Sequence, residues 1–405
     1  MNPARQQQPR VIGAVERSQS SMQSDMPQRV WISFRVALSA LIGLGLIAGS
    51  AAALSAPIVR QVSGTLTHKG TITISGIGFG SKTNAAPVVW DDATASTLSA
   101  KWDGAWPNQL PGYNTGYYSP MRGINPPHSH DARYIAGAHA ASTGAYSGYN
   151  VIFFKNIPLQ PFPFYIYASW YQRADDKWTF SGDNNLKTFA YSNCCSPYEM
   201  PNNWYAAYGP PHPGSTTDSA QWVINDDGSS MQNPDTNAHS FWWNPAVNPM
   251  GGKWSKVEIA ARLTNQTDGY VKVWENGQQV VNYAGATDKY PGTQRTIGIG
   301  GYARAQGFSG NWRYFDDAYV DTTLSRVVLA DKPVLSQATI IENQIPSAWS
   351  DGSITATVNL GQFAQGQTAF VIVVDSSGIA SAIGLAVTAG GTIATPNPPS
   401  SISVH

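Results

Sequence analysis

Charged side chains are scarce in this sequence and show no excess of either sign. Only 12% of the 405 residues are charged, and 25 basic residues balance 25 acidic ones, so the formal net charge is zero. A protein that binds nucleic acid normally carries a basic excess, because phosphate neutralisation supplies most of its affinity. Electrostatic attraction to an anionic membrane depends on the same excess. The composition therefore argues against both kinds of partner.

Cysteine is almost absent, since the chain has only Cys194 and Cys195, which are adjacent. Two neighbouring cysteines cannot form a disulfide framework, although a strained bond within the pair is open to them in an oxidising compartment. The thiols could also bind a soft metal, but no further thiol exists to complete such a site. A vicinal disulfide that stiffens a loop and an inert pair of thiols are both compatible with the sequence.

A long apolar run occurs only near the N-terminus. Residues 1–35 are polar, and the apolar residues 36–48 lead into small residues up to Ala53. A basic flank, a short apolar stretch and small residues are the parts of a secretory signal, so we expect residues 1–53 to be a signal peptide with a long n-region. The alternative is an uncleaved membrane anchor, because apolar character continues to Val59 and about 20 such residues can span a bilayer.

Aromatic and turn-forming residues are abundant, with 14 Trp, 19 Tyr, 38 Gly and 27 Pro. This composition is typical of many short strands joined by structured loops. Residues 164–171 and 256–263 alternate between apolar and polar with a period of two. Residues 270–275 run into Asn276 and Gly277, a dipeptide that strongly favours a type I′ hairpin. We therefore predict an all-β fold of antiparallel strands.

These strands carry a resemblance to a known fold. Segments similar to the strands of concanavalin A-like lectin, glucanase and polysaccharide-lyase domains are 167–171, 184–187, 252–259 (GKWSKVEI), 268–277 (DGYVKVWENG) and 313–320 (RYFDDAYV). The resemblance spans residues 86–325 and implies an antiparallel β-sandwich of the concanavalin A-like jelly-roll type. It says more about the fold than about the activity.

The flanks of this region resemble a smaller domain. Residues 70–80 resemble the opening strands of an immunoglobulin-like IPT/TIG domain, and counterparts of the later strands occur from 345 to 374. We expect residues 58–85 and 326–394 to form one split Ig-like β-sandwich with the jelly roll inserted, because insertions are tolerated at loop tips. A short N-terminal strand region followed by an independent C-terminal sandwich is the alternative. Residues 395–405 are predicted to be a disordered tail.

Catalytic motifs are missing from the sequence. Retaining glucanases of this fold present acidic residues at alternate positions of one strand, and no Glu-x-Asp-x-x-Glu run occurs. Gly-x-Ser-x-Gly, P-loop and His-Glu-x-x-His motifs are also absent. A lyase instead needs a group that neutralises a uronate carboxylate, a base and an acid, roles that Arg, His, Lys and Tyr can fill. The catalytic candidates are Lys187, Tyr191, His239 and Arg304, with Arg262, Lys272 and Tyr302 as further residues of these types.

Aromatic rings and loop histidines are candidates for sugar contacts. Rings with amide groups nearby are how proteins hold sugar rings, and on an extended backbone His128 and His130 point to the same side, where they could share a metal or a sugar hydroxyl. A solvated loop is the alternative for the two histidines. The candidate carbohydrate-binding residues are His128, His130, Trp204, Trp242, Trp243 and Trp274.

Two acidic pairs fall where related folds often hold a structural calcium ion. Asp91 and Asp92 lie near the start of the jelly roll, and Asp316 and Asp317 lie in its closing strand. Carboxylates from two parts of the chain supply the hard oxygen ligands that calcium prefers. The resemblance thus implies calcium as a cofactor, although solvated turn residues would look the same.

The sequence favours a secreted or surface-displayed protein that binds a polysaccharide or other glycan through the jelly roll. The Ig-like module would space the jelly roll or dock it to a neighbouring surface protein, and no membrane partner remains once the leader is removed. A polysaccharide lyase that acts by β-elimination on a uronate polymer is the alternative, so catalytic activity stays open. A structural or adhesive surface protein is the third interpretation.

Removal of the leader is directly measurable. Because the apolar stretch ends in the small residues Ala51 and Ala53, cleavage is expected after Ala53. Intact-mass analysis of the exported protein should give an N-terminus near Leu54. Recovery of the full leader in a membrane fraction would show that the segment is an anchor.

Overall fold

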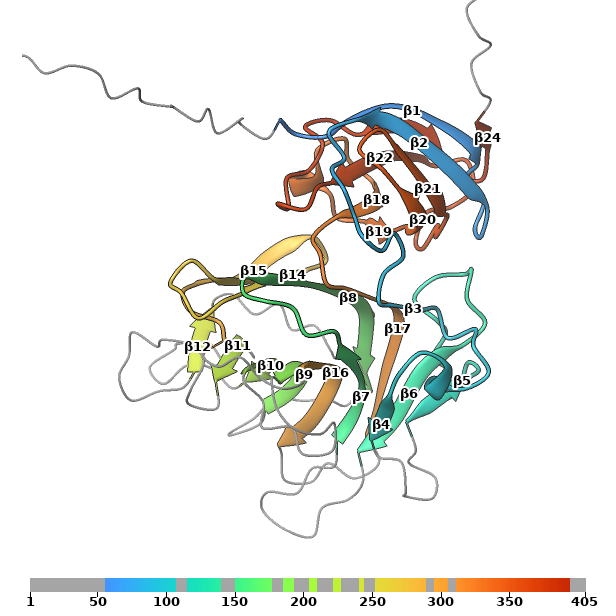
Figure 1. Ribbon diagram of the computed structural model, residues 1–405. Coiled ribbons are helices and arrows are strands. Elements are labelled where there is room, and N and C mark those ends of the chain that lie inside the picture. The colour runs from blue at the N-terminus through green and yellow to red at the C-terminus, as the bar shows by residue number, and fades with distance from the viewer. Residues whose placement is uncertain are drawn as a thin grey trace, which may run out of the picture. The chain divides into compact units, whose positions relative to one another are not determined.

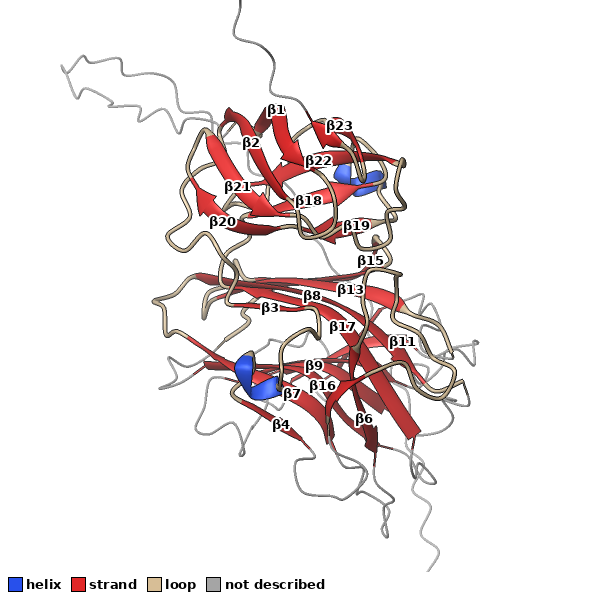
Figure 2. Cartoon of the chain, turned by 90° about the vertical axis from the view of Figure 1, so that its right-hand side faces the viewer, coloured by secondary structure: helices blue, strands red, loops and turns tan. Residues whose placement is uncertain are grey.

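The computed structural model describes residues 55–106, 115–139, 150–176, 185–192, 204–209, 221–226, 240–243, 252–288, 295–304 and 311–393. Figure 1 shows the arrangement of the strands. The described helical elements are two short 3-10 turns, Leu98–Ala100 and Leu335–Gln337, and strands and loops make up most of the rest of Figure 2. The described strands pair antiparallel, so the prediction of an all-β, antiparallel fold is confirmed. In this part of the chain no helix has the length and apolar character to cross a membrane.

The larger sandwich consists of an eight-stranded and a seven-stranded sheet. The eight-stranded sheet has the order β15 (Gln278–Ala284), β14 (Tyr270–Glu275), β13 (Ser255–Leu263), β8 (Phe164–Ala174), β17 (Asn311–Asp321), β6 (Tyr134–His139) and β5 (Gly116–Tyr118), with β3 (Val89–Asp91) paired to β17. The seven-stranded sheet has the order β12 (Ser240–Trp243), β11 (Gln221–Asp226), β10 (Trp204–Gly209), β9 (Asn185–Ser192), β16 (Arg295–Arg304), β7 (Asn150–Ile157) and β4 (Gly104–Trp106).

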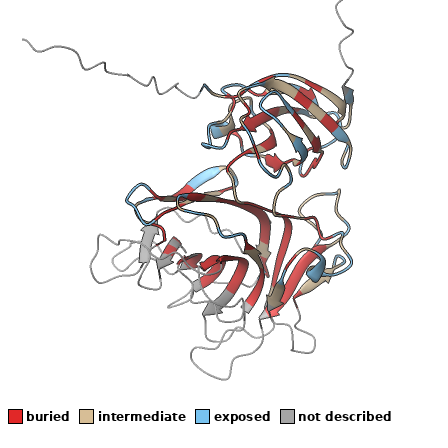
Figure 3. Ribbon diagram, in the orientation of Figure 1, coloured by how far each residue is buried: buried red, intermediate tan, exposed pale blue. Residues whose placement is uncertain are grey.

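The core of the larger sandwich lies between these two sheets. Alternate residues of β8, such as Ile166 and Trp170, point into it and are fully buried. The seven-stranded sheet contributes Phe189 and Ile299, and Trp170 stacks on Phe189 with ring centroids 5.9 Å apart. Figure 3 shows buried residues running along the described strands. Each large apolar side chain buried here contributes about 1.5 to 3 kcal/mol.

The predicted period-two segments and the hairpin are found in the eight-stranded sheet. The two segments belong to β8 and β13, which pair antiparallel. Asn276 and Gly277 join β14 to β15 with φ angles of 49° and 77°. A type I′ turn requires positive φ at both central residues, which Asn and Gly tolerate. Local turn chemistry therefore fixes the register of this hairpin.

The smaller sandwich takes strands from both sides of the larger one in the sequence. One of its sheets has the order β20 (Ile345–Trp349), β21 (Ser353–Thr357), β2 (Thr71–Ile77), β1 (Ile58–Thr65) and β24 (Thr392–Ile393). The other has the order β19 (Ile341–Asn343), β18 (Arg326–Ala330), β22 (Thr368–Val374) and β23 (Leu385–Thr388). Ile72 packs with Leu329, Ile354 and Val371 in one buried cluster, so these distant segments share a core.

Polar contacts connect the smaller sandwich to the outer face of the eight-stranded sheet. Glu342 in β19 accepts hydrogen bonds from Lys256 Nζ (2.6 Å) and from the hydroxyl of Tyr171. The amide of Asn343 donates to Ser169 Oγ at 2.6 Å. All five residues are buried, so these contacts are shielded from water.

A buried carboxyl group connects the two sheets of the larger sandwich. Glu275 is 1% exposed and accepts hydrogen bonds from Trp222 Nε1 (2.9 Å) and from the hydroxyl of Tyr208 (3.3 Å), both of the opposite sheet. Burial raises the pKa of Glu275 to about 7, although the hydrogen bonds that it accepts offset part of this effect.

The free energy of unfolding should depend on pH because of the carboxyl group of Glu275. Glu275 of the unfolded chain loses its proton near pH 4.5, whereas the folded protein keeps it up to about pH 7. A rise in pH across this window therefore favours the unfolded state, by a total on the order of 3 kcal/mol. In E275Q the neutral amide still accepts from Trp222 and donates to Tyr208, so this contribution should vanish. Thermal midpoints of the wild-type protein and of E275Q, measured between about pH 4 and pH 8, test this contribution. If the two midpoints change with pH in the same way, the prediction is wrong.

Candidate functional site

Lys187 lies on the outer face of the seven-stranded sheet. Its neighbour Leu186 packs into the core, and Lys187 pairs with Ala207, which lies between the core residues Ala206 and Tyr208. Successive residues of a strand point to opposite faces, so Lys187 points away from the core. Lys187 is nevertheless only 5% exposed. This face therefore carries an ammonium group that is largely withdrawn from water.

Small residues surround Lys187 on this face. Ala190 and Ala207 flank it, and on β16 Gly298 and Gly300 alternate with residues that point into the core. These neighbours are themselves buried, with Ala190 2% exposed and Ala207 fully buried. Around Lys187 the outer face therefore carries short side chains and one positive charge, and it is shielded from water.

A β-bulge in β16 lies next to this lysine in the sheet. The ladder between β16 and β9 is interrupted after Ile299 pairs with Phe189 and resumes where Ala303 pairs with Leu186, so β16 carries one extra residue. The backbone of Tyr302 lies in the interrupted part, and that of Arg304 pairs with Asn185. The interrupted part of the ladder includes Lys187 on β9.

Arg313 stabilises the bulge from within the core. It is fully buried in β17, and its Nη1 donates hydrogen bonds to the main-chain oxygens of Lys187 (2.7 Å) and Gly301 (3.4 Å). A Cβ atom at Gly301 would lie 2.4 Å from Cβ of Lys187, so only glycine fits there. Burial lowers the pKa of Arg313 to about 9. The buried guanidinium of Arg313, which is far from Lys187 in the sequence, thus holds the backbone at Lys187 in place through a hydrogen bond.

Tyr191 and Trp204 lie in the core and not on this face. The hydroxyl of Tyr191 donates a hydrogen bond to Asp288 Oδ2 at 2.6 Å, and Trp204 packs against Tyr191 and Phe189. Both are fully buried. The structure therefore does not bring either residue to Lys187.

An irregularity of β9 explains the position of Tyr191. The ladder between β9 and β10 shifts its register between Ala206 and Ala207, which leaves Thr188 as an extra residue of β9. One extra residue inverts the inside-outside alternation of everything that follows it. Tyr191, four residues after Lys187, consequently points to the opposite side of the sheet.

The other predicted sugar-site residues are spread over the molecule. His239 lies outside the described residues. Trp242 and Trp243 belong to the edge strand β12, where they pair with Val223 and Trp222. Trp274 is partly buried on β14, in the other sheet. The four predicted tryptophans are therefore not gathered into one platform.

A second group of polar side chains gathers beside β17. His128 Nε2 lies 3.0 Å from Oδ2 of Asp317 and 3.0 Å from Oδ2 of Asp131. Asn359 of the smaller sandwich donates a hydrogen bond to Asp317 Oδ2 at 2.8 Å. Asp316 precedes Asp317 and is fully buried. We call His128, Asp131, Asp316 and Asp317 the His-Asp cluster.

A bulge in β17 presents the two aspartates together. The ladder between β17 and β8 shifts its register between Asp316 and Tyr319, and Asp317 has a φ of 46°. In a regular strand neighbouring side chains point to opposite faces, but the left-handed residue breaks this alternation. As a result, both Asp316 and Asp317 are close enough to Asp131 to change the pKa of its carboxyl group.

The electrostatics of the cluster are unfavourable without a further partner. Burial raises the pKa of Asp131 and places that of Asp316 well above its usual range, with neighbouring carboxylates adding to both effects. Burial alone would lower the pKa of His128, but the charges of Asp317 and Asp131 raise it to about 9.

The donor atoms of the cluster fit a divalent cation. Three buried atoms lack a hydrogen-bond partner among the described residues: His128 Nδ1, Asp316 Oδ2 and Asp317 Oδ1. Asp131 Oδ2 accepts no hydrogen bond there either, and its contact at 3.0 Å with His128 Nε2 is an ion pair. One ligand atom each from His128, Asp131 and Asp317 lie within 4.8 Å of one another. Unpartnered buried carboxylates are costly, and oxygen ligands with one imidazole are a usual donor set for divalent metals.

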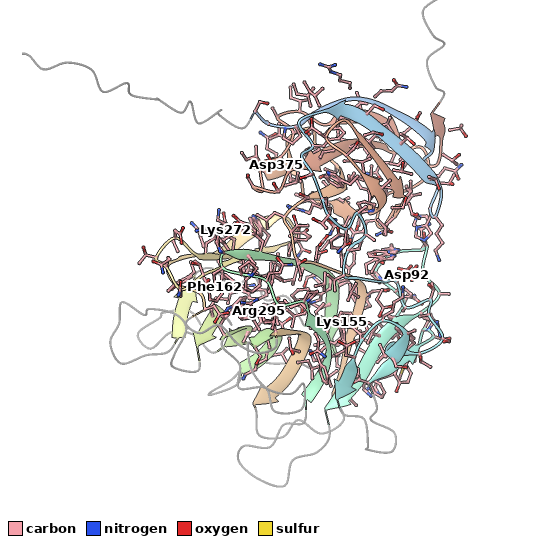
Figure 4. The ribbon with its side chains drawn as sticks, in the orientation of Figure 1. Asp92, Lys155, Phe162, Lys272, Arg295 and Asp375 are labelled. Atoms are coloured by element: carbon pink, nitrogen blue, oxygen red, sulfur yellow. The ribbon has the colours of Figure 1, made fainter. Side chains whose placement is uncertain are left out.

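The two other predicted calcium ligands have different partners. Asp91 is buried and accepts hydrogen bonds from Trp102 Nε1 (2.6 Å) and from the hydroxyl of Tyr117 (2.7 Å). Asp92, labelled in Figure 4, accepts a hydrogen bond from Thr94 Oγ1 at 2.6 Å. Protein donors therefore satisfy both carboxylates.

His130 and Asp131 show what sequence reasoning found and missed in this loop. The ring of His130 stacks on His68 at 4.9 Å, and its Nε2 lies 3.4 Å from the main-chain oxygen of Phe363. His130 thus contacts the smaller sandwich instead of sharing a ligand with His128. Asp131, which does share the site of His128, was missed, although it directly follows the histidine pair in the sequence.

No protein-family model and no curated protein matches the sequence. Among solved structures, an endo-β-1,4-glucuronan lyase from the fungus Trichoderma reesei is similar at 13% identity and a TM-score of 0.43, covering 59% of this chain and 96% of that one. The alginate lyase Aly36B is similar at 12% identity and a TM-score of 0.40, with coverages of 59% and 98%. The cellulose induced protein Cip1 is similar at 15% identity and a TM-score of 0.35, covering 58% of this chain and 97% of that one. Scores of this size do not assign an activity.

Proposed function

We propose that the protein binds an acidic polysaccharide on the outer face of its seven-stranded sheet. The observation that supports this most directly is the position of Lys187, an almost unexposed lysine on a face otherwise built from alanine and glycine near it. A carboxylate of the polymer that pairs with this ammonium group would be shielded from water, and a desolvated charge pair is stronger than one in water. The side chains of Ala190 and Ala207 beside it are short, which suits the close approach of a sugar ring to a backbone.

A second candidate function, cleavage of the same polymer by β-elimination, is favoured by the register of β9 and β16. In this reaction a base removes the proton beside the uronate carboxylate, the C–O bond to the leaving sugar breaks as a C=C bond forms, and an acid protonates the leaving oxygen. Lys187 or Arg304 would neutralise the carboxylate, and Tyr302 would take the proton as a phenolate and then, as a phenol, give it to the leaving oxygen. The backbone of Tyr302 lies in the interrupted part of the β16–β9 ladder, which includes Lys187 on β9, and this supports the assignment.

The binding proposal predicts a selective effect of Lys187. K187Q should weaken the binding of a glucuronate polymer by about 2 kcal/mol, roughly thirtyfold, because it removes a desolvated charge contact. K253Q makes the same change at an exposed lysine and should bind like the wild-type protein. Titration calorimetry against a panel of acidic and neutral polysaccharides measures both. Equal affinity of the two variants, or equal affinity for neutral polymers, would refute the proposed site.

The lyase alternative predicts a separate effect of Tyr302. Y302F should leave binding nearly intact and lower turnover by about 100-fold or more, because it removes only the proton-transfer group. Absorbance in the unsaturated-uronate band records turnover. A wild-type protein that binds the polymer without any rise in this absorbance excludes the lyase activity and leaves the binding function.

We further propose that the His-Asp cluster holds a structural divalent cation. The cluster joins the loop before β6 to β17, and Asn359 brings in the smaller sandwich. Carboxylate oxygens suit calcium or manganese, whereas the imidazole of His128 suits zinc. The unpartnered carboxylate oxygens of Asp316 and Asp317 support a cation of either kind.

Removal of this cation should lower the thermal midpoint by about 5 °C, because a ligand present at roughly 100 times its Kd stabilises the folded state by about 2.7 kcal/mol. Calcium, manganese and zinc added back one at a time identify the ion that restores it. D131N should lose the response, whereas D268N, which changes an exposed carboxylate, should keep it. A midpoint that neither chelator nor any of the three ions changes would remove the cation from this site.

A further inference from the structure

A pocket of about 520 Å³ lies between the eight-stranded sheet and the smaller sandwich. The sheet contributes Tyr270, Lys272 and Trp274 of β14, and the smaller sandwich contributes Ser336, Ser381 and Ala382. Small-molecule sites usually have volumes of about 300 to 1,000 Å³. The pocket is therefore of a size that accepts a short saccharide.

The residue sizes on its two sides explain why the pocket is open. On the smaller sandwich its wall includes six serine, alanine and glycine residues beside Val334, Leu335 and Ile341, whereas its wall on the sheet carries large rings. Where two protein surfaces pack for stability alone, side chains fill the space to the density of a crystal. Here many of the facing side chains are short, and Tyr270 and Trp274 stay partly exposed.

The three β14 residues form one continuous surface. Tyr270, Lys272 and Trp274 are alternate residues of a strand, so they share its outer face, and all three are partly exposed. Lys272 Nζ lies 4.9 Å from the centroid of the Tyr270 ring, and Lys272 is labelled in Figure 4. Rings that alternate with a cation are suited to a ligand with one apolar face and one negative group.

The charge of the pocket is positive. Lys272 and Arg326 both line it, and among the described residues neither has a carboxylate within ion-pair distance. Arg326 lies over the ring of Tyr167, with its Cζ 4.1 Å from the centroid, and its buried Nε has no hydrogen-bond partner. The acidic residue of the lining, Glu258, accepts a hydrogen bond from the hydroxyl of Tyr167 at 2.5 Å.

We propose that this pocket binds a sugar unit that bears a carboxylate. The carboxylate pairs with Lys272 and Arg326, and the ring of the sugar stacks on Trp274. The inference rests on the proposed function, because it places a second contact for the same acidic polymer on the opposite side of the larger sandwich. Two sites on one protein raise the overall affinity for a long polymer or crosslink two chains of it.

Calorimetric titration with a glucuronate tetrasaccharide tests the pocket. The wild-type protein should bind two molecules per chain, and K272Q or W274A should lose one binding event, with at least a tenfold loss of affinity at that site. W274F, which keeps a ring, should lose less than W274A. K253Q serves as the matched control for K272Q, and a glucose tetrasaccharide, which lacks the carboxylate, should not bind at this site. Moderate salt should weaken the event without abolishing it.

A variant that fills the pocket tests the proposal even if K272Q or W274A fails to fold. Ser336 is exposed at the rim, so S336W should fill the space while the thermal midpoint stays near that of the wild-type protein. Normal stoichiometry and affinity in K272Q, W274A and S336W together would overturn the pocket. If K187Q alone loses binding, the outer-face site stands and the pocket fails, and if only the pocket variants lose binding, the reverse holds. Absence of any binding to the wild-type protein overturns both.

Discussion

The contact of Glu342 with Lys256 and Tyr171 joins the smaller sandwich to the larger one. A carboxylate with an ammonium group at 2.6 Å and a phenol hydroxyl, all buried, holds the smaller sandwich against the eight-stranded sheet. Loss of one member of such a group typically costs about 3 to 5 kcal/mol, because the remaining charge is left unpaired. The outer face of the eight-stranded sheet is thereby committed to a partner within the chain.

The two sheets consequently differ in what their outer faces and bulges carry. The eight-stranded sheet uses polar residues on its outer face to attach the smaller sandwich, and its bulge at Asp316 and Asp317 turns two acids toward one point. The seven-stranded sheet uses a bulge of its own, held by Arg313, to set Lys187 among small residues. In both sheets the irregular part of a strand carries the residues of a proposed site, and the regular part carries the core.

The sequence was sufficient for the features that depend on local chemistry. The alternation in β8 and β13 and the Asn276–Gly277 turn are read from adjacent residues, and each follows from one physical rule. The site depended on contacts between distant residues. Lys187 and Tyr191 are four residues apart and would share a face in a regular strand. Thr188 is an extra residue that breaks the period of two, and no pattern in the sequence predicts such a bulge. Asp131 and Arg313 act through partners that only the folded chain brings near.

The strand order of the smaller sandwich also governs how the protein responds to mechanical load. Both connections to the larger sandwich leave from the same small domain, where β1 pairs with β24 and β2 pairs with β21. A pull applied at residues 55 and 393 is transmitted through the hydrogen bonds of these pairs and does not pass through the larger sandwich. The larger sandwich is therefore outside the load path until the smaller one opens, so it keeps its shape while the chain is under tension.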